Sequence, residues 1–309
     1  MGKIKNKEKL NFKKIKPADK GLYESYFFSE KERGCEVTFA NLYMWGEQNI
    51  AEYDGNLLLF SKFGERYLYP YPLGAGDKKK AIDAIILDAR ERGVPLYISG
   101  IGKTAKKTIE ELYPDKFRFD TREGSYDYVY SRDDLADLPG KKYHQKRTHI
   151  NRFLEDFPNY CLLPIAKDNL HMVRNMAAEW YNDRLLESPE SDFDMEMTAL
   201  DRALSSYSAL SFEGLILLDG ERVLAFTIAS RMSNDTFDVH FEKALSVARG
   251  AYPMINSSFA KYIREKYPEI RFLDREEDMG IEGLRKAKRS YHPHHMVEKW
   301  RAALLENEI

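Results

Sequence analysis

Cysteine and long apolar runs are both scarce in this sequence. Its 309 residues include only two cysteines, Cys35 and Cys161, too few for the disulfide framework of a secreted scaffold, so we expect reduced thiols. No stretch approaches the roughly 20 consecutive apolar residues that a membrane-spanning helix needs. The basic segment 3–7 is not followed by the apolar region of a signal peptide. These absences predict a cytoplasmic protein without a membrane span.

A dominant charge sign is also missing. Lysine and arginine number 48 against 50 aspartates and glutamates, a formal net charge of −2, which argues against general nucleic-acid binding but leaves local patches open. With 18 glycines and 12 prolines, the chain is neither collagen-like nor of low complexity. Its 43% hydrophobic and 32% charged residues exclude the disordered class. The length predicts about two domains.

What the sequence does contain is the same order of elements twice. Each copy has a strand, an amphipathic helix, an Asp-Gly turn between apolar strands, a further strand, a glycine-containing turn, a second helix and a last strand. Asp-Gly between apolar runs predicts a tight hairpin, because both central positions tolerate positive φ. The matching features are 12–15 and 161–165, Asp19 and Asp168 as helix caps, Asp54-Gly55 and Asp219-Gly220, 67–69 and 237–241, 74–76 and 249–252, and 95–98 and 270–273.

This repeat predicts a duplicated α+β (mixed α/β) fold, with a twisted mixed sheet flanked by helices in each copy. The Pro139-Gly140 pair marks the junction, because proline and glycine interrupt regular structure. We therefore divide the chain into an N-terminal domain, 1–138, and a C-terminal domain, 139–309. If the copies are equivalent, Gly74 and Gly250 occupy the same topological position.

A basic segment, 141–152, follows the junction and is expected to form a helix between the halves. Ile150, Phe153 and Phe157 give it one apolar stripe, which predicts that it is fixed against a core. Many cations fixed together are unfavourable without an anion or carboxylates nearby. We expect Lys142, His144 and Arg147 to line an interdomain cleft opposite Arg285 and Lys288, with either a bound anion or Asp274, Glu276 and Asp278 as partners.

The C-terminal segment is densely charged. An acidic run at 274–278 precedes the basic run 285–289 and the sequence His292-Pro293-His294-His295. Arginine and lysine of this kind suit phosphate or carboxylate recognition, and a solvated basic rim is the alternative. We expect ion pairs rather than a metal at the acidic run, because no spaced Cys/His ligand set accompanies it.

Glu242 is the candidate general base. It ends an apolar strand close to the turn 249–252, where a carboxylate could accept a proton from a substrate; the alternative is an ion pair with Lys243 or a nearby arginine. The turns 74–76 and 249–252 are candidate phosphate sites, since a helix N-terminus offers free N–H groups, although plain helix starts have the same form. Neither a P-loop nor a nucleophile elbow is present.

Several motifs together resemble a known family. They are residues 35–43, 140–147, 241–243, 250–256, 274–280 and 283–291. They resemble an uncharacterised bacterial family that is similar to the C-terminal domain of phosphatidylglycerol lysyltransferases. The resemblance covers nearly the whole chain and implies two tandem acyltransferase folds of the N-acetyltransferase (GNAT) type, in agreement with the duplication.

The resemblance also implies an activity and a site. The lysyltransferases move an aminoacyl group from tRNA to a lipid, and related tandem proteins build peptidoglycan cross-bridges. Membrane-spanning segments precede this domain in the lysyltransferases and are absent here, which weighs against a lipid acceptor. The residues that the resemblance implies are Lys142, His144, Arg147, Glu242, Asp274, Arg275, Glu276, Arg285 and Lys288. We expect Glu242, Asp274 and Glu276 to act in catalysis and Lys142, His144, Arg147 and Arg275 to bind the substrate. The expected donor-binding residues are Arg249, Gly250, Ala251, Tyr252, Arg285 and Lys288.

GNAT enzymes commonly bind the pyrophosphate of acyl-coenzyme A at a Q/R-x-x-G-x-G/A turn. Residues 71–76 keep both glycines and lack the cation, whereas residues 247–252 keep one glycine and end in tyrosine. The resemblance therefore makes coenzyme A or acyl-CoA a candidate cofactor and aminoacyl-tRNA a candidate partner, both bearing phosphate. No metal is expected.

We therefore expect an acyl- or aminoacyltransferase that moves an activated acyl group to an amine or hydroxyl acceptor. Positioning and charge stabilisation, rather than a covalent intermediate, would accelerate the transfer. The alternative is a non-catalytic module that binds an anionic ligand, such as a nucleotide, coenzyme A or a tRNA end, in the same cleft.

Overall fold

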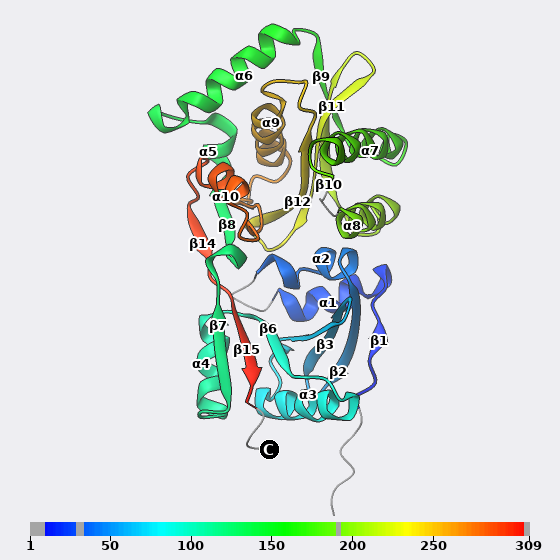
Figure 1. The fold of residues 1–309 in the computed structure, drawn as a ribbon, viewed down its shortest axis with the longest axis vertical. Helices are drawn as coiled ribbons and strands as arrows, with labels where there is room; N and C mark the ends of the chain where they lie inside the picture. The colour runs from blue at the N-terminus through cyan, green and yellow to red at the C-terminus, as the bar shows by residue number, and fades with distance from the viewer. Residues whose placement is uncertain (1–9, 29–33, 190–192, 306–309) are drawn as a thin grey trace, which may run out of the picture. The chain divides into compact units, whose positions relative to one another are not determined.

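The computed structural model describes residues 10–28, 34–189 and 193–305, so the basic segment 3–7 lies outside the described residues. The chain divides into two compact units (Figure 1). Unit 1 comprises residues 1–123 and 298–309, and unit 2 comprises residues 124–297. Among the described residues, no helix combines the length and the apolar character that crossing a bilayer requires.

Unit 1 is built on one sheet with the strand order β1-β2-β3-β4-β6-β15-β7, and β5 pairs with β3. Leu58 and Phe60 of β3 share a core with Ile82 and Ile85 of α3. The elements are β1 (Lys13–Lys14), α1 (Lys20–Phe27), α2 (Phe39–Met44), β2 (Glu47–Tyr53), β3 (Asn56–Phe63), β4 (Arg66–Pro70), β5 (Leu73–Gly74), α3 (Lys78–Arg92), β6 (Tyr97–Ile101), α4 (Lys103–Leu112), β7 (Phe117–Thr121) and β15 (Trp300–Leu304), with 3-10 turns η1 (Pro17–Asp19) and η2 (Cys35–Val37).

Unit 2 has a second sheet, with the strand order β14-β8-β13-β12-β11-β10-β9. The sheet is mixed, because β12 and β13 are parallel while the other pairs are antiparallel. The elements are β8 (Asp127–Ser131), α5 (Arg132–Asp137), η4 (Lys141–Tyr143), α6 (His144–Asp156), β9 (Tyr160–Pro164), α7 (Leu170–Glu187), α8 (Asp194–Ser205), β10 (Glu213–Asp219), β11 (Arg222–Arg231), β12 (Thr236–Ala244), α9 (Ala251–Lys266), β13 (Phe272–Asp274), α10 (Glu282–Arg289) and β14 (His295–Val297); η3 (Glu123–Ser125) precedes β8.

The two sheets have the same topology. Starting from β1 and from β9, their first five strands follow in chain order and are joined by equivalent hairpins and helices. Asp54-Gly55 joins β2 to β3, and Asp219-Gly220 joins β10 to β11. Gly74 and Gly250 both lie between the fourth strand and the helix that follows it. The predicted duplication and the α+β fold are therefore confirmed.

The sixth position of each sheet is filled by a strand from the other half of the sequence. β15 pairs with β6 and β7 in unit 1, and β8 pairs with β13 and β14 in unit 2. The units consequently differ from a division at residue 138: β8 and α5 belong to unit 2, and β15 belongs to unit 1. An alternating strand pattern does not reveal which sheet the strand joins.

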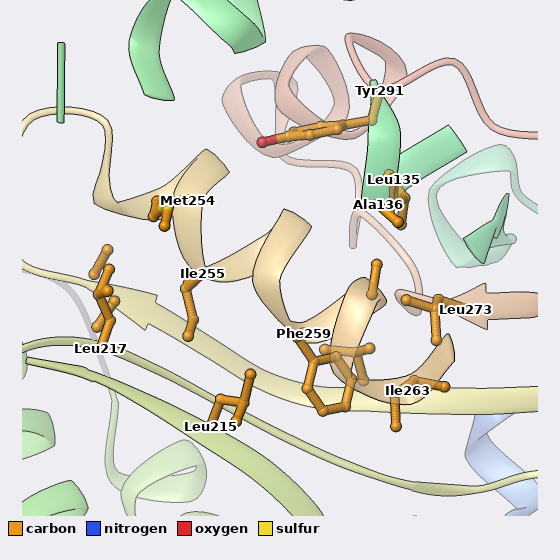
Figure 2. Close-up of a cluster of buried hydrophobic side chains, with 14 of the residues drawn as sticks. Leu135, Ala136, Leu215, Leu217, Met254, Ile255, Phe259, Ile263, Leu273 and Tyr291 are labelled. Carbon is orange, nitrogen blue, oxygen red and sulfur yellow. The ribbon is translucent and has the colours of Figure 1, made fainter. Parts of the chain in front are cut away.

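The core of unit 2 fixes α9 and α6 against the sheet. Figure 2 shows Phe259 and Ile263 of α9 directed at the sheet in which β10 carries Leu215 and Leu217. Each such buried side chain stabilises the fold by roughly 1.5–3 kcal/mol. Phe153 of α6 is fully buried in the same core. The predicted apolar stripe on the basic helix is therefore confirmed.

Candidate functional site

The site is a polar cluster around Glu242 and Arg275 in unit 2. β12 and β13 run parallel, so residues at their carboxyl ends meet at one edge of the sheet. Glu242 lies near the end of β12, and Arg275 directly follows β13. Arg275 Nη2 lies 2.7 Å from Glu242 Oε1, and the two side chains are 12% and 5% exposed. The arginine partner that the sequence left open for Glu242 is thus Arg275.

Helix α9 and strand β11 enclose the carboxylate of Glu242. Asn256 of α9 donates its amide N–H to both carboxylate oxygens, at 3.3 and 3.4 Å. The hydroxyl of Tyr252 donates to the backbone carbonyl of Glu242. Thr227 of β11 is the register partner of Glu242 and therefore lies on the same face of the sheet. The duplicated fold thus delivers side chains from two strands and one helix to one carboxylate.

Aromatic rings surround the guanidinium of Arg275. Its Cζ lies 5.0 Å from the ring centre of Tyr291 and 5.7 Å from that of Tyr130. Both tyrosines are buried, and burial raises the pKa of each phenol, so both remain neutral. Neutral rings contact the cation without cancelling its charge, so Glu242 supplies the compensating carboxylate.

Lys146 of α6 adds a second cation to this cluster. Its ammonium donates to Ser290 Oγ at 2.7 Å and lies 3.8 Å from the ring centre of Tyr291. Burial, and secondarily the charge of Arg275, lowers the pKa of Lys146 to about 8. Lys146 is not among the site residues predicted from the sequence. Its spacing offered a signal, because Lys146 precedes Ile150 by four residues and Phe153 by seven and so shares their helix face.

Three buried polar atoms of the cluster have no hydrogen-bond partner among the described residues. They are Nη1 of Arg275, Oδ1 of Asn256 and Oγ1 of Thr227. Such atoms are unfavourable unless water or a ligand completes them. Together they offer one cationic donor, one amide acceptor and one hydroxyl beside a carboxylate. This arrangement suits a small group that carries both a carbonyl oxygen and an N–H or O–H.

The acidic run after β13 shapes the turn that carries Arg275. Asp274 Oδ1 accepts the N–H of Glu276 and Asp278 Oδ1 accepts the N–H of Gly280, each at 2.8 Å. Asp278 also pairs with Arg285 at 2.8 Å, and this arginine holds the pKa of the Asp278 carboxyl well below its usual range. The ion pair expected at this run is therefore present.

Lys288 supports the same turn. Its buried ammonium donates to the carbonyls of Arg275 and Glu276. Arg285 binds Asp278 through Nε and Nη2. These contacts place Lys288 and Arg285, both expected at the donor, as supports that hold Arg275 in position. Glu276, expected in catalysis, instead faces His240, with Oε1 3.2 Å from Nδ1.

The basic residues of η4 and of the first turn of α6 do not have the partners that the sequence predicted. Lys142 pairs with Asp134 at 3.1 Å, not with the acidic run. Arg147 donates to the carbonyls of Leu138 and Gly140 and so closes the turn before the helix. His144 is exposed. Of the cations in this segment, Lys146 is the one that the structure brings to Arg275.

Gly250 is required by helix packing. Its φ is +83°, and a Cβ there would collide with the carbonyl of His149 on α6. The N–H groups of Ala251 and Met254 are bonded to the carbonyls of Ala248 and Gly250, and residue 253 is a proline without an N–H. The start of α9 therefore offers few amides to a phosphate, and Arg249 beside it is exposed.

The equivalent turn of unit 1 is filled in a similar way. A Cβ on Gly76 would collide with the carbonyl of Asp54 in the neighbouring hairpin. The ammonium of Lys78 donates to the carbonyl of Pro72 at 2.8 Å and to Asn56 Oδ1 at 3.0 Å. The absence of a side chain in this turn thus makes room for the neighbouring hairpin of the same protein. The glycine spacing is explained without a bound ligand.

Lys243 is separate from the Glu242 cluster. It pairs with Glu196 of α8 at 2.9 Å and lies 3.5 Å from the ring centre of Trp180. Burial lowers the pKa of Lys243. The ion pair of Glu242 with Lys243, one alternative from the sequence, is therefore wrong.

Known proteins share this architecture. A protein of unknown function from Bacteroides thetaiotaomicron is similar over 96% of this chain and 100% of its own, with 36% identity and a TM-score of 0.90. L-PGS from Bacillus licheniformis is similar over 99% and 96%, with 17% identity and a TM-score of 0.66. A tandem GNAT protein from the clavulanic acid biosynthesis pathway covers 97% and 100%, with 10% identity and a TM-score of 0.52.

Sequence comparisons agree with these folds. An uncharacterised protein of Mycoplasmoides gallisepticum is 25% identical over 182 residues, which span 58% of this chain and 56% of that protein, little more than half of each. Residues 28–303 match the family described as "Phosphatidylglycerol lysyltransferase, C-terminal". This match spans most of the chain, and the two sheets share one strand order. The chain therefore belongs to the family of the phosphatidylglycerol lysyltransferase C-terminal domain.

Proposed function

We propose that this protein transfers an activated acyl or aminoacyl group to an amine or hydroxyl acceptor, and that the Glu242–Arg275 cluster is the site of transfer. The observation that carries the proposal is the buried ion pair surrounded by three polar atoms without a partner among the described residues. Membership in a family described by lysyl transfer supports the same chemistry.

The proposed roles follow from the charges. Arg275 Nη1 binds the carbonyl oxygen of the donor and stabilises the oxyanion that forms on attack. Glu242, Asn256 Oδ1 and Thr227 Oγ1 accept hydrogen bonds from an ammonium or hydroxyl group beside that carbonyl. The acceptor nitrogen or oxygen attacks the carbonyl carbon, the bond to the donor oxygen or sulfur breaks, and the acceptor's proton passes to the leaving group. No covalent enzyme intermediate is needed.

Aminoacyl-tRNA is the donor that we favour over acyl-coenzyme A. The amides at the start of α9 are largely bonded within the protein, and Gly250 accommodates α6, so a pyrophosphate finds few N–H donors there. An α-amino group on the acyl chain would also use the acceptor atoms around Glu242, which an acetyl group leaves unfilled. Arg249 and His144, both exposed, are proposed contacts for donor phosphates.

The test is a transfer assay with two donors. Purified protein is incubated with radiolabelled aminoacyl-tRNA or acyl-coenzyme A, with amines, hydroxyl compounds and phosphatidylglycerol vesicles as acceptors. We expect transfer from aminoacyl-tRNA, at least tenfold above the rate with Arg275→Met. Saturable donor binding without turnover on any acceptor would favour the non-catalytic binding module. The absence of both binding and turnover would overturn the proposal.

A further inference from the structure

A second cluster of polar side chains lies outside the Glu242 site. His240 of β12 is fully buried, and its Nδ1 lies 3.2 Å from Glu276 Oε1 and 3.5 Å from Asp238 Oδ2. One ligand atom from each residue falls within 4.8 Å of the other two. The other ring nitrogen of His240, Nε2, lies 2.8 Å from Ser230 Oγ on β11. The cluster therefore has one imidazole nitrogen and two carboxylate oxygens around a common point.

The two carboxylate oxygens converge on one ring nitrogen, Nδ1 of His240. Nδ1 of an imidazole carries at most one hydrogen, yet two carboxylate oxygens approach it. A cation at that point would contact Nδ1 and both oxygens at once. The convergence on a single ring nitrogen is thus the arrangement of a metal-ligand set.

The distances fit a first-row metal ion. Metal–nitrogen and metal–oxygen bonds in such sites measure about 2.0–2.2 Å, which places neighbouring ligand atoms of a tetrahedral or octahedral ion about 3.0–3.5 Å apart. The two separations from Nδ1, 3.2 and 3.5 Å, lie in this interval. Ser230 Oγ meets the distal nitrogen, as outer partners of metal-bound histidines commonly do, and can fix the tautomer that leaves Nδ1 free to ligate.

The backbone aims these ligands from two elements. The pairing of β11 with β12 shifts register beside His240, between the pairs Ile228–Phe241 and Ala229–Val239, so the histidine sits at a bulge, which redirects a side chain. Glu276 has a φ of +57°, a conformation that non-glycine residues adopt at a cost, and its N–H is held by Asp274.

We propose that Asp238, His240 and Glu276 bind a divalent first-row transition ion such as Zn²⁺ or Mn²⁺. One imidazole with two carboxylates suits these ions better than Ca²⁺ or Cu⁺, which favour all-oxygen and sulfur ligands. Three protein ligands leave at least one position for water or substrate. The ion would join β12 to the turn that carries Arg275, the neighbour of Glu276. The proposal does not depend on the transfer activity.

Direct metal binding tests it. Protein dialysed against chelator is titrated with Zn²⁺ alone, and separately with Mn²⁺ alone, by calorimetry, and the metal retained after gel filtration is measured. We expect one ion per chain and a higher melting temperature with metal. His240→Gln and Glu276→Gln should abolish this site, and Ser230→Ala should weaken binding by about tenfold or more.

The matched control is the exposed histidine pair His294 and His295, whose Nδ1 atoms lie 2.9 Å apart. The double variant His294→Gln/His295→Gln removes a surface site that could capture Zn²⁺ and should leave the proposed ion in place. The Glu276 side chain is partly exposed, and glutamine has the same shape as glutamate, so we expect Glu276→Gln to fold. This variant therefore tests the site even if His240→Gln does not fold. Absence of binding, or binding lost with His294 and His295 and kept in Glu276→Gln, would overturn the proposal.

Discussion

Units 1 and 2 share one strand order, and each has a polar cluster between its fourth strand and the helix that follows. In unit 1, Tyr69 of the fourth strand donates to Asp88 of the following helix at 2.7 Å, and Arg92 binds both oxygens of that carboxylate. In unit 2, Glu242 of the fourth strand meets Asn256 of the following helix and Arg275. The same strand and helix thus hold a polar cluster in both units.

The two polar clusters differ in whether all their polar atoms have hydrogen-bond partners within the protein. Both oxygens of Asp88 have donors within the protein, so the unit 1 cluster serves packing between strand and helix. The unit 2 cluster leaves Arg275 Nη1, Asn256 Oδ1 and Thr227 Oγ1 without partners among the described residues. The polar cluster of unit 1 is therefore satisfied within the protein, whereas that of unit 2 has capacity for a ligand.

The largest effect on stability is expected from removing β15, the strand that the C-terminal end of the chain adds to the sheet of unit 1. Truncation after residue 297 deletes β15, which lies between β6 and β7 in unit 1. Loss of an interior strand should cost more than about 5 kcal/mol, the lower range of whole-domain stability, so unit 1 should unfold while unit 2 stays protected in hydrogen exchange. A truncation after Leu305, which keeps β15, is the control. If unit 1 stays folded without β15, this strand is not an essential interior strand of its sheet, and the prediction is contradicted.

Arg275→Met should have the next largest effect, because it leaves the Glu242 carboxylate buried without its cation. Removing one partner of a buried pair costs about 3–5 kcal/mol. In urea unfolding, the double variant Glu242→Gln/Arg275→Met should recover most of this loss, while its transfer rate should stay at least tenfold below that of the wild type. If the double variant is no more stable than the single one, the pair does not behave as a coupled buried unit.

Gly250→Ala should be destabilising by more than the strain of a positive φ alone, about 1–3 kcal/mol, because its Cβ also meets the His149 carbonyl. The matched control is Gly220→Ala, at φ +57° with nothing within 4 Å, which should show the strain alone. Thermal unfolding compares the two. Equal losses would mean that α6 is not packed closely on this glycine.

The smallest effect concerns pH. The pKa of Lys146 is lowered to about 8, so between this value and its ordinary value near 10.4 the unfolded chain binds more protons than the folded one. The free energy of unfolding of the wild type, relative to Lys146→Met, should therefore rise with pH through that window, by less than about 1.4 kcal/mol per pH unit. A difference between wild type and Lys146→Met that stays constant with pH would contradict the burial of the Lys146 ammonium.

Repeated local patterns explain what the sequence could predict. Asp54-Gly55, Asp219-Gly220 and the 3.6-residue stripe of Ile150 and Phe153 are local signals, and the structure confirms the hairpins and the helix. Membership of β8 and β15 in particular sheets depends on pairing over more than a hundred residues, which a local pattern does not encode.

Glu242 and Arg275 could be named as separate candidates from the sequence. Their pairing required the parallel alignment of β12 with β13. Lys146 and Tyr291 lie far apart in the chain and meet only when α6 packs against the rest of unit 2. Asp274 and Lys288 carry the right charge for a site, but in the folded chain they bond to the backbone of the turn.

The most direct test compares the two polar clusters in one assay. Single-turnover aminoacyl transfer is measured for the wild type, Glu242→Gln in unit 2 and Asp88→Asn in unit 1, with melting temperatures recorded to confirm folding. We expect at least a hundredfold loss for Glu242→Gln and less than a threefold change for Asp88→Asn. At about 1.36 kcal/mol per factor of ten, the hundredfold loss corresponds to about 2.7 kcal/mol of lost transition-state stabilisation. Equal losses in the two folded variants, or full activity in Glu242→Gln, would contradict this prediction.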